Sequence, residues 1–197
     1  IGAGSQAEYG IHEKKTNSKD FLNPQNYYGA SKLASSYFTK IRCSELGIKH
    51  IWFRVFSVYG PYDSMNTLVM SSIKCFMNNE SIDFTTAEHN WDFIYSKDAA
   101  NAFYLASIYD LKNSFYCLGS GVSKPLKEYI KMIHKFTKSN TILEFGKREN
   151  TDKHVKYLEA DIDDLKYELN FTPEHSFESG IQQTIKWYNN YAQTKKI

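Results

Sequence analysis

The sequence has few of the residues on which disulfide frameworks and metal-binding modules depend. It contains three cysteines, at positions 43, 75 and 117, which lie far apart and never in a CxxC spacing. A sparse, odd set argues against disulfides and a cysteine zinc site, and is typical of reduced thiols in a cytosolic protein. The six histidines show no ligand-like spacing, so we expect no metal site.

Long apolar runs and clusters of positive charge are also missing. No stretch approaches the ~20 apolar residues that a transmembrane helix needs, and no signal peptide is visible. The net charge is +2 and the basic residues are scattered, whereas a nucleic-acid surface gathers them on one face. We therefore expect a cytoplasmic protein that binds neither membrane nor nucleic acid. Because the chain begins at Ile1 and not at methionine, we expect its natural N-terminus to lie upstream.

What the chain does contain is an alternation of strand-like and helix-like segments. Residues 1–9 look like a strand end that runs into a polar connection, and apolar residues at helical spacing follow from Tyr27 to Leu46. This order predicts a parallel α/β sheet, with the last two helices in a smaller cap. Further strands are expected at 50–56, 82–84, 93–95 and 115–118, and further helices at 67–78, from 99 onward, and at 125–138, 161–169 and 176–193.

The helix expected from Tyr27 carries a tyrosine and a lysine four residues apart. Tyr28 and Lys32 therefore project from one helix face. An ammonium close to a phenol favours the phenolate, so this tyrosine could serve as an acid or base near neutral pH. With 15 tyrosines in the chain, a YxxxK match is expected about once by chance, so a stray pair on an exposed helix is the alternative.

A glycine pattern near the start of the chain imitates a dinucleotide-binding loop. Residues 2–7 formally match G-x-G-x-x-G/A. That motif must open an amphipathic helix, but the stretch that follows, 9–15, is polar and has no apolar stripe. We therefore expect no phosphate-binding loop here.

Several segments in register carry a resemblance that no single motif does. They are residues 5–10 (SQAEYG), 28–32 (YGASK), 53–61 (FRVFSVYGP), 91–100 (WDFIYSKDAA), 116–121 (YCLGSG) and 160–165 (ADIDDL). Together they resemble, over the whole chain, the C-terminal part of the extended short-chain dehydrogenases/reductases, the NAD(P)-dependent epimerases, dehydratases and ketoreductases of nucleotide sugars.

The resemblance implies an α/β fold, the C-terminal part of a Rossmann-like parallel sheet with a small α/β substrate-binding cap. Residues 1–61 would be the C-terminal part of the NAD(P)-binding domain, including the catalytic helix. Residues 62–197 would be mainly the cap, with 98–120 returning to the sheet. The dinucleotide fingerprint would lie in a preceding half, so we expect this chain alone to be poorly soluble or inactive, and the complete protein to be a homodimer.

The resemblance also assigns roles residue by residue. Ser5 matches the Ser/Thr that hydrogen-bonds the substrate oxygen, and Tyr28 matches the acid/base that exchanges a proton with it. Lys32 matches the lysine that holds the nicotinamide ribose and favours the tyrosinate. Val55 and Phe56 match the loop whose backbone orients the nicotinamide carboxamide, which implies NAD or NADP as cofactor.

Dehydratases of the family carry acidic residues one and two places after the Ser/Thr. This chain has Gln6 and Ala7 there, and neither can act as a general acid or base. The nearby Glu8 is one place off, and we expect it to point away on the strand. We therefore expect the protein not to be a dehydratase.

The substrate-binding positions also depart from the family pattern. Ser57 stands where many relatives have a substrate-contacting Asn, and Trp91 stands where many have a diphosphate-binding Arg. A tryptophan cannot supply a bidentate cationic contact, so the diphosphate must find another partner. Trp91 either stacks on the base or packs in the core.

These features lead us to expect NAD(P)-dependent oxidoreduction at a ring carbon of a nucleoside-diphosphate sugar, with C4 favoured. A 4-epimerase and a 4-keto-6-deoxy-sugar reductase both fit the residues. The alternative is a non-catalytic relative that binds a nucleotide or a protein, and the intact set of Ser5, Tyr28 and Lys32 argues against it.

Overall fold

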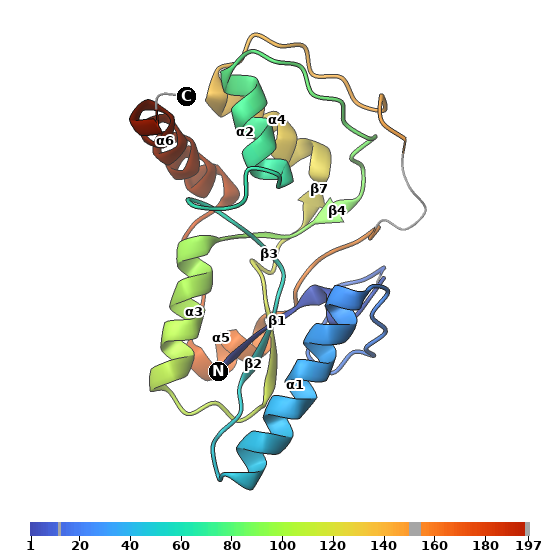
Figure 1. The fold of residues 1–197 in the computed structure, drawn as a ribbon, viewed down its shortest axis with the longest axis vertical. Coiled ribbons are helices and arrows are strands. Elements are labelled where there is room, and N and C mark those ends of the chain that lie inside the picture. Colours follow the sequence, from blue (N-terminus) through green and yellow to red (C-terminus); the bar gives the residue numbers. More distant parts are fainter. Residues whose placement is uncertain (12, 150–154, 196–197) are drawn as a thin grey trace.

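The computed structural model describes residues 1–11, 13–149 and 155–195. In Figure 1 the molecule is elongated, with a parallel sheet in its lower part and a cap of helices in its upper part. The sheet has the strand order β1-β2-β6, and both neighbouring pairs are parallel. Its strands are β1 (Gly2–Ser5), β2 (Trp52–Val55) and β6 (Phe115–Leu118).

The register of this sheet places the carboxyl ends of its strands level with one another. Ser5 is the partner of Val55, and Val55 is the partner of Leu118. In open α/β sheets, ligands bind outside the carboxyl ends of the strands. The fold therefore brings two of the predicted site residues, Ser5 and Val55, to the edge where a ligand would lie.

Helices lie on both sides of this sheet. Figure 1 shows α1 (Tyr27–Glu45) on one side of the strands and α3 (Ser96–Ile108) on the other. Helix α5 (Asp163–Leu169), which we expected in the cap, packs with α3 against the sheet instead. Its Leu165 and Leu169 are four residues apart on one helix face, and both are buried in the same core. Other members of that core are Ile51, Phe53, Ala102, Tyr116 and Leu118.

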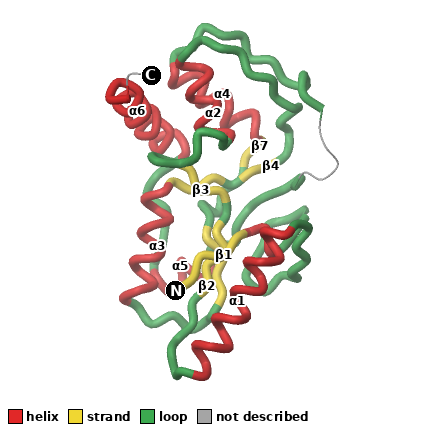
Figure 2. The backbone as a smooth tube through the Cα atoms, in the orientation of Figure 1, coloured by secondary structure: helices red, strands yellow, loops and turns green. Residues whose placement is uncertain are grey.

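A second apolar core builds the cap. The parallel pair β3–β5 and the antiparallel pair β4–β7 contribute to it, and Figure 2 shows their strands in yellow between the sheet and the cap helices. Met70, Ile130 and Ile181 are fully buried where three helices meet. The cap elements are β3 (Ser57–Tyr59), α2 (Leu68–Met77), β4 (Asn90–Trp91), β5 (Phe93–Tyr95), β7 (Lys124–Pro125), α4 (Leu126–Thr137) and α6 (Phe177–Lys195).

The expected α/β class is confirmed, and every helix expected from periodicity is present within a few residues of its expected bounds. The strand expected at 82–84 is wrong. Only Phe84 pairs there, in an isolated bridge with Phe145, while Asp83 is exposed. Strands β3, β4 and β7, of two or three residues each, were not expected.

The glycines of the false dinucleotide motif have a packing role. A Cβ on Gly2 would lie 2.2 Å from the Trp52 ring, and one on Gly4 would lie 2.1 Å from the indole nitrogen of the same residue. The motif also opens no long helix, since β1 leads into η1 (Gln6–Glu8), a single three-residue 3-10 turn. Gly2 and Gly4 are therefore needed because an indole lies flat against the strand.

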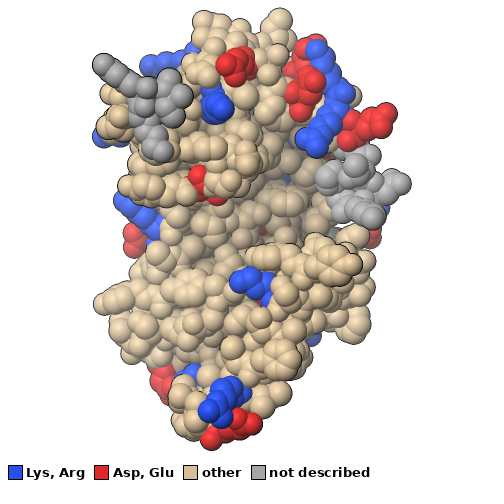
Figure 3. Space-filling view, viewed as in Figure 1, with Lys and Arg blue, Asp and Glu red and all other residues tan. Residues whose placement is uncertain are grey.

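The described surface agrees with the scattered charges of the sequence. Figure 3 shows basic and acidic side chains intermixed on the face that it presents, mostly toward the two ends of the molecule. None of the described helices combines the length and apolar character that a bilayer span requires. The described residues also contain no group of three His, Cys, Asp or Glu side chains that could hold a metal. His12 and His154 lie outside the described residues.

Asp92 joins the cap to the sheet. It has no exposed surface, and its carboxylate accepts hydrogen bonds from the backbone N–H groups of Ser120, Gly121 and Ala160 at 2.8–3.1 Å. The Ser120 hydroxyl donates a further bond at 2.6 Å. Burial raises the pKa of the Asp92 carboxyl, while these hydrogen bonds oppose the rise. One side chain thus holds the loop after β6 and the segment before α5 against strand β5.

We predict that Asp92→Ala lowers the free energy of unfolding by about 2 to 4 kcal/mol, because it leaves several buried N–H groups without an acceptor. Urea unfolding followed by circular dichroism would measure the change. Asp83→Ala, at an exposed position, is the matched control and should stay within about 0.5 kcal/mol of wild type. Equal stability of the two variants would contradict the role given to Asp92.

Candidate active site

Ser5 lies where β1 ends and the chain turns. Its backbone is extended (φ −148°, ψ 148°), and its side-chain oxygen accepts the N–H of Ala7 at 3.1 Å. The residue is only 8% exposed. Because the oxygen acts as an acceptor within the turn, the hydroxyl proton remains available to donate to a ligand oxygen.

Tyr28 and Lys32 project from the first turns of α1. The Asn26 side chain caps this helix by accepting the N–H of Gly29 at 2.8 Å. Lys32 Nζ lies 5.9 Å from the centre of the Tyr28 ring and donates to the Ala3 carbonyl of β1 at 2.9 Å. The Tyr28 side chain is 56% exposed, which leaves its phenol accessible to a ligand. The predicted pair on one helix face is therefore present, beside the strand that carries Ser5.

A glycine brings this helix close to the Ser5 turn. A Cβ on Gly29 would lie 2.3 Å from the Ala7 carbonyl oxygen, so only glycine permits the contact. Ala7 is also the residue whose N–H is bound by Ser5. The close approach of Gly29 therefore places Tyr28 next to the turn that holds the Ser5 hydroxyl. Sequence reasoning gave this glycine no role.

Val55 ends β2 and Phe56 comes directly after it, so both lie at the same edge of the sheet as Ser5. The Phe56 N–H donates to the Leu118 carbonyl at 2.8 Å, which ties the chain after β2 to β6. The Phe56 ring is buried with Tyr9 and Ile162, so the side chain serves packing. One edge of the sheet thus carries Lys32, the accessible phenol of Tyr28 and the fixed backbone of residues 55–56. These are groups that suit the binding of a nicotinamide ribose and carboxamide.

Ser57 and Trp91 line a cavity of about 510 Å³ next to this edge. The Trp91 indole N–H donates to the Ser57 hydroxyl oxygen at 2.7 Å. The Trp91 ring is partly buried and packs on Phe93, 6.4 Å between ring centres. The expected packing of Trp91 in the core is thus present, and Trp91 also lines the cavity, whereas its stacking on a base stays a prediction.

Arg148 lines the same cavity. It comes from the segment after α4, far in sequence from Ser57 and Trp91, and its side chain is exposed. The cavity therefore contains the cationic group that Trp91 cannot supply. No spacing in the sequence marks Arg148, so its place could be found only from the fold.

The expectation that Glu8 lies on the strand was wrong. Glu8 does not lie on the strand, because the chain leaves β1 at Ser5 and turns through η1. Its carboxylate is fully buried, accepts the Ser5 backbone N–H at 3.0 Å, and forms an ion pair with Arg54 at 2.9 Å.

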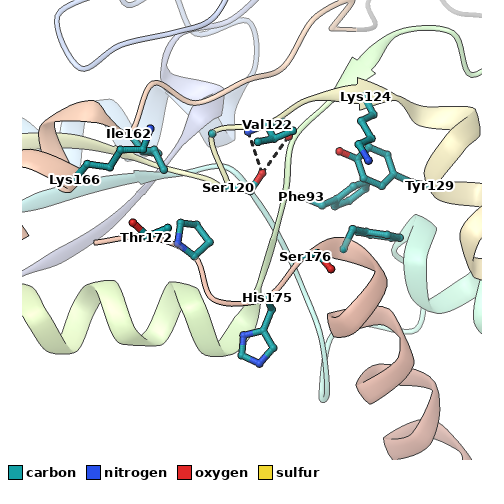
Figure 4. Close-up of a pocket in the computed structure, with 13 residues that line it drawn as sticks. Phe93, Ser120, Val122, Lys124, Tyr129, Ile162, Lys166, Thr172, His175 and Ser176 are labelled. Carbon is teal, nitrogen blue, oxygen red and sulfur yellow. Dashed lines mark hydrogen bonds between the residues drawn. The ribbon is translucent and has the colours of Figure 1, made fainter. Parts of the chain in front are cut away.

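A second hollow of about 420 Å³ lies between the sheet and the cap, and Figure 4 shows its lining. Lys124, Lys166 and His175 contribute to it, but none of the predicted site residues does. His175 Nδ1 is already engaged with Asp98 at 2.9 Å. The cavity beside Ser57 is therefore the better candidate for substrate.

Known proteins are similar to this chain in sequence. CDP-abequose synthase of Salmonella muenchen is 30% identical over 166 residues, which covers 80% of this chain and 55% of that protein. A dTDP-4-dehydro-6-deoxyglucose reductase of Escherichia coli is 26% identical over 182 residues, which covers 90% of this chain and 57% of the reductase. The chain thus spans little more than half the length of these relatives.

Solved structures share the fold. A UDP-glucose 4-epimerase from Thermotoga maritima, solved with UDP-glucose, superposes with a TM-score of 0.88 at 20% identity and covers 96% of this chain and 62% of its own. The sequence model of the NAD dependent epimerase/dehydratase family matches residues 1–114, which include Ser5, Tyr28, Lys32 and Ser57. The chain belongs to the NAD dependent epimerase/dehydratase family.

Proposed function

We propose that the complete protein reduces the C4 carbonyl of a nucleoside-diphosphate 4-keto-6-deoxy sugar, with NADH or NADPH as reductant. The observation that carries the proposal is the placement of Tyr28 and Lys32 beside the Ser5 turn, at the carboxyl end of the sheet. The names of the two relatives, a CDP-abequose synthase and a 4-dehydro-6-deoxyglucose reductase, support a reductive reaction.

The chain's residues would manage the proton and the developing charge. A nicotinamide cofactor held by Lys32 and the backbone of residues 55–56 would provide the hydride for the carbonyl carbon. As negative charge develops on the carbonyl oxygen, Ser5 donates a hydrogen bond to it and Tyr28 transfers its phenolic proton to it. The Lys32 ammonium stabilises the phenolate that remains. Hydride and proton together convert the carbonyl to a secondary alcohol.

The turn after Ser5 argues against a dehydratase. Gln6 and Ala7 offer no carboxyl group, and the nearest one, Glu8, is buried and bound to Arg54. Elimination of water needs an acid and a base beside the sugar. Dehydratases occur among the relatives at 24% identity, so this inference rests on the residues of the turn.

For the substrate, we propose that the nucleotide lies in the cavity of Ser57 and Trp91. Arg148 would bind the diphosphate, since guanidinium groups pair with phosphate oxygens through two parallel bonds. Ser57 would donate its proton to the same ligand, because its oxygen already accepts from Trp91.

A 4-epimerase is the second candidate, favoured by the likeness of fold to UDP-glucose 4-epimerase. The same three residues would serve both directions of hydride transfer. We also propose a cytoplasmic homodimer that uses α1, on which Tyr37, Phe38 and Ile41 are 48–72% exposed.

We predict that Tyr28→Phe lowers kcat of the complete protein by about 10² to 10⁴, because the proton donor is lost while the ring remains. Initial rates of NAD(P)H consumption would measure the effect, and circular dichroism would verify the fold. Tyr27→Phe, at the neighbouring position with 96% exposure, is the matched control and should keep the wild-type rate. A Tyr28→Phe variant as active as Tyr27→Phe would rule out the proposed catalysis.

Cofactor content separates the two reactions. We predict that the complete protein, purified without added nucleotide and then denatured, releases substoichiometric NAD(P), since a reductase exchanges its cofactor in each turnover. It should then oxidise NADH or NADPH with dTDP- or CDP-linked 4-dehydro-6-deoxyglucose. Stoichiometric NAD released on denaturation would favour the epimerase. A protein that carries no cofactor and turns over neither the 4-dehydro-6-deoxy sugar nor a nucleoside-diphosphate hexose would favour the non-catalytic alternative.

A further inference from the structure

A buried ion pair lies directly behind Ser5. Glu8 has no exposed surface, Arg54 is 2% exposed, and Arg54 Nε donates to Glu8 Oε2 at 2.9 Å. Two charges withdrawn from water to this extent are costly unless further hydrogen bonds satisfy both of them. The partners of those bonds indicate what the pair does.

The remaining oxygen of Glu8 is committed to the Ser5 turn. Oε1 accepts the Ser5 backbone N–H and the Trp52 indole N–H, each at 3.0 Å. A Cβ on Gly4 would lie 2.4 Å from this oxygen, so the strand backbone presses against the carboxylate. The carboxylate therefore has little freedom to move relative to Ser5.

Arg54 binds the ion pair to two further segments of the chain. Its Nη1 donates to the Tyr9 hydroxyl at 3.1 Å and to the Ser18 carbonyl at 2.9 Å. Burial tends to lower the pKa of the Arg54 guanidinium, but its interactions with Tyr9 and Glu8 outweigh burial and raise the pKa overall. The arginine therefore stays charged and links β2, the residue after η1, and the connection that leads to α1.

We infer that Glu8 and Arg54 are positioning residues for Ser5: they fix the backbone of its turn and so direct the Ser5 hydroxyl toward the substrate oxygen. This inference rests on the function proposed above. Neither side chain would touch the substrate. Arg54 also neutralises Glu8, so that no net negative charge stands behind the oxygen on which negative charge develops.

Glu8→Gln tests the inference in the complete protein, with dTDP- or CDP-linked 4-dehydro-6-deoxyglucose as substrate. The amide retains one acceptor oxygen but presents an N–H group to Arg54, so the turn should shift. We expect kcat to fall about 10- to 100-fold while KM for the nucleotide sugar changes less than about threefold. An unchanged kcat would overturn the inference.

The decisive readout is a double-mutant cycle with Ser5→Ala. If Glu8 acts through Ser5, adding Glu8→Gln to Ser5→Ala should lower kcat by less than about twofold further. If the fold-decreases in kcat of the two single variants instead multiply in the double variant, the inference is overturned and the proposed function stays intact. A Ser5→Ala variant with wild-type kcat would overturn the proposed function itself, and the inference with it.

Glu168→Gln is the matched control. Glu168 also accepts several hydrogen bonds, from the Lys112 N–H at 2.6 Å and the Tyr116 hydroxyl at 2.7 Å among others, but beside the opposite end of β6. Its replacement should lower stability without lowering kcat. An equal fall in kcat for Glu168→Gln would overturn the inference, since general loosening would then explain both variants.

If Glu8→Gln does not fold, Trp52→Phe provides the same test, because it removes one donor from Oε1 and leaves the ion pair in place. We expect a smaller fall in kcat, about three- to tenfold, that again disappears in the Ser5→Ala background. A fall that persists in that background would overturn the inference.

Discussion

A charge pair withdrawn from water holds together the turn that carries Ser5, the first residue of the candidate site. Glu8 and Arg54 have almost no exposed surface, and each is surrounded by groups that satisfy it. Breaking such a pair by removing one partner is far more costly than its net contribution to stability suggests. The Ser5 turn and the start of β2 are therefore held in one arrangement.

The thiol nearest this pair is kept neutral by burial. Tyr9 bonds both Arg54 and the Cys117 sulfur, which lies 3.0 Å from the Tyr9 hydroxyl. Burial raises the pKa of the Cys117 thiol to about 12, so it stays neutral. Cys117 therefore packs as a small apolar side chain and does not act as a reactive thiol.

The helices, and the position of Tyr28 and Lys32 on one helix face, could be predicted from the sequence. The 3.6-residue period indicates the helices and the four-residue spacing indicates the shared face, because both depend on local geometry. What was missed depends on contacts between distant segments. Glu8 meets Arg54 across 46 positions, and Arg148 reaches the cavity of Ser57 only through the folding of the cap.

The position of α5 also depends on contacts between distant segments and not on local geometry. Its apolar face was visible in the sequence, but nothing local tells whether that face meets the sheet or the cap. For the candidate site, proton transfer would depend on residues at the strand ends, while the choice of sugar and nucleotide would depend on a cavity assembled from separate loops. This explains why the family could be predicted from the sequence and the substrate could not.

In the proposed reaction, hydride reaches C4 of the sugar while Tyr28 supplies the proton. This can be tested by giving the complete protein NADH or NADPH that carries deuterium at the transferable position, together with the 4-dehydro-6-deoxy sugar that it turns over. We expect a product with one deuterium at C4, seen by NMR as loss of the C4 proton signal. A product that carries no deuterium at C4, or carries it at another carbon, would contradict the proposed reaction.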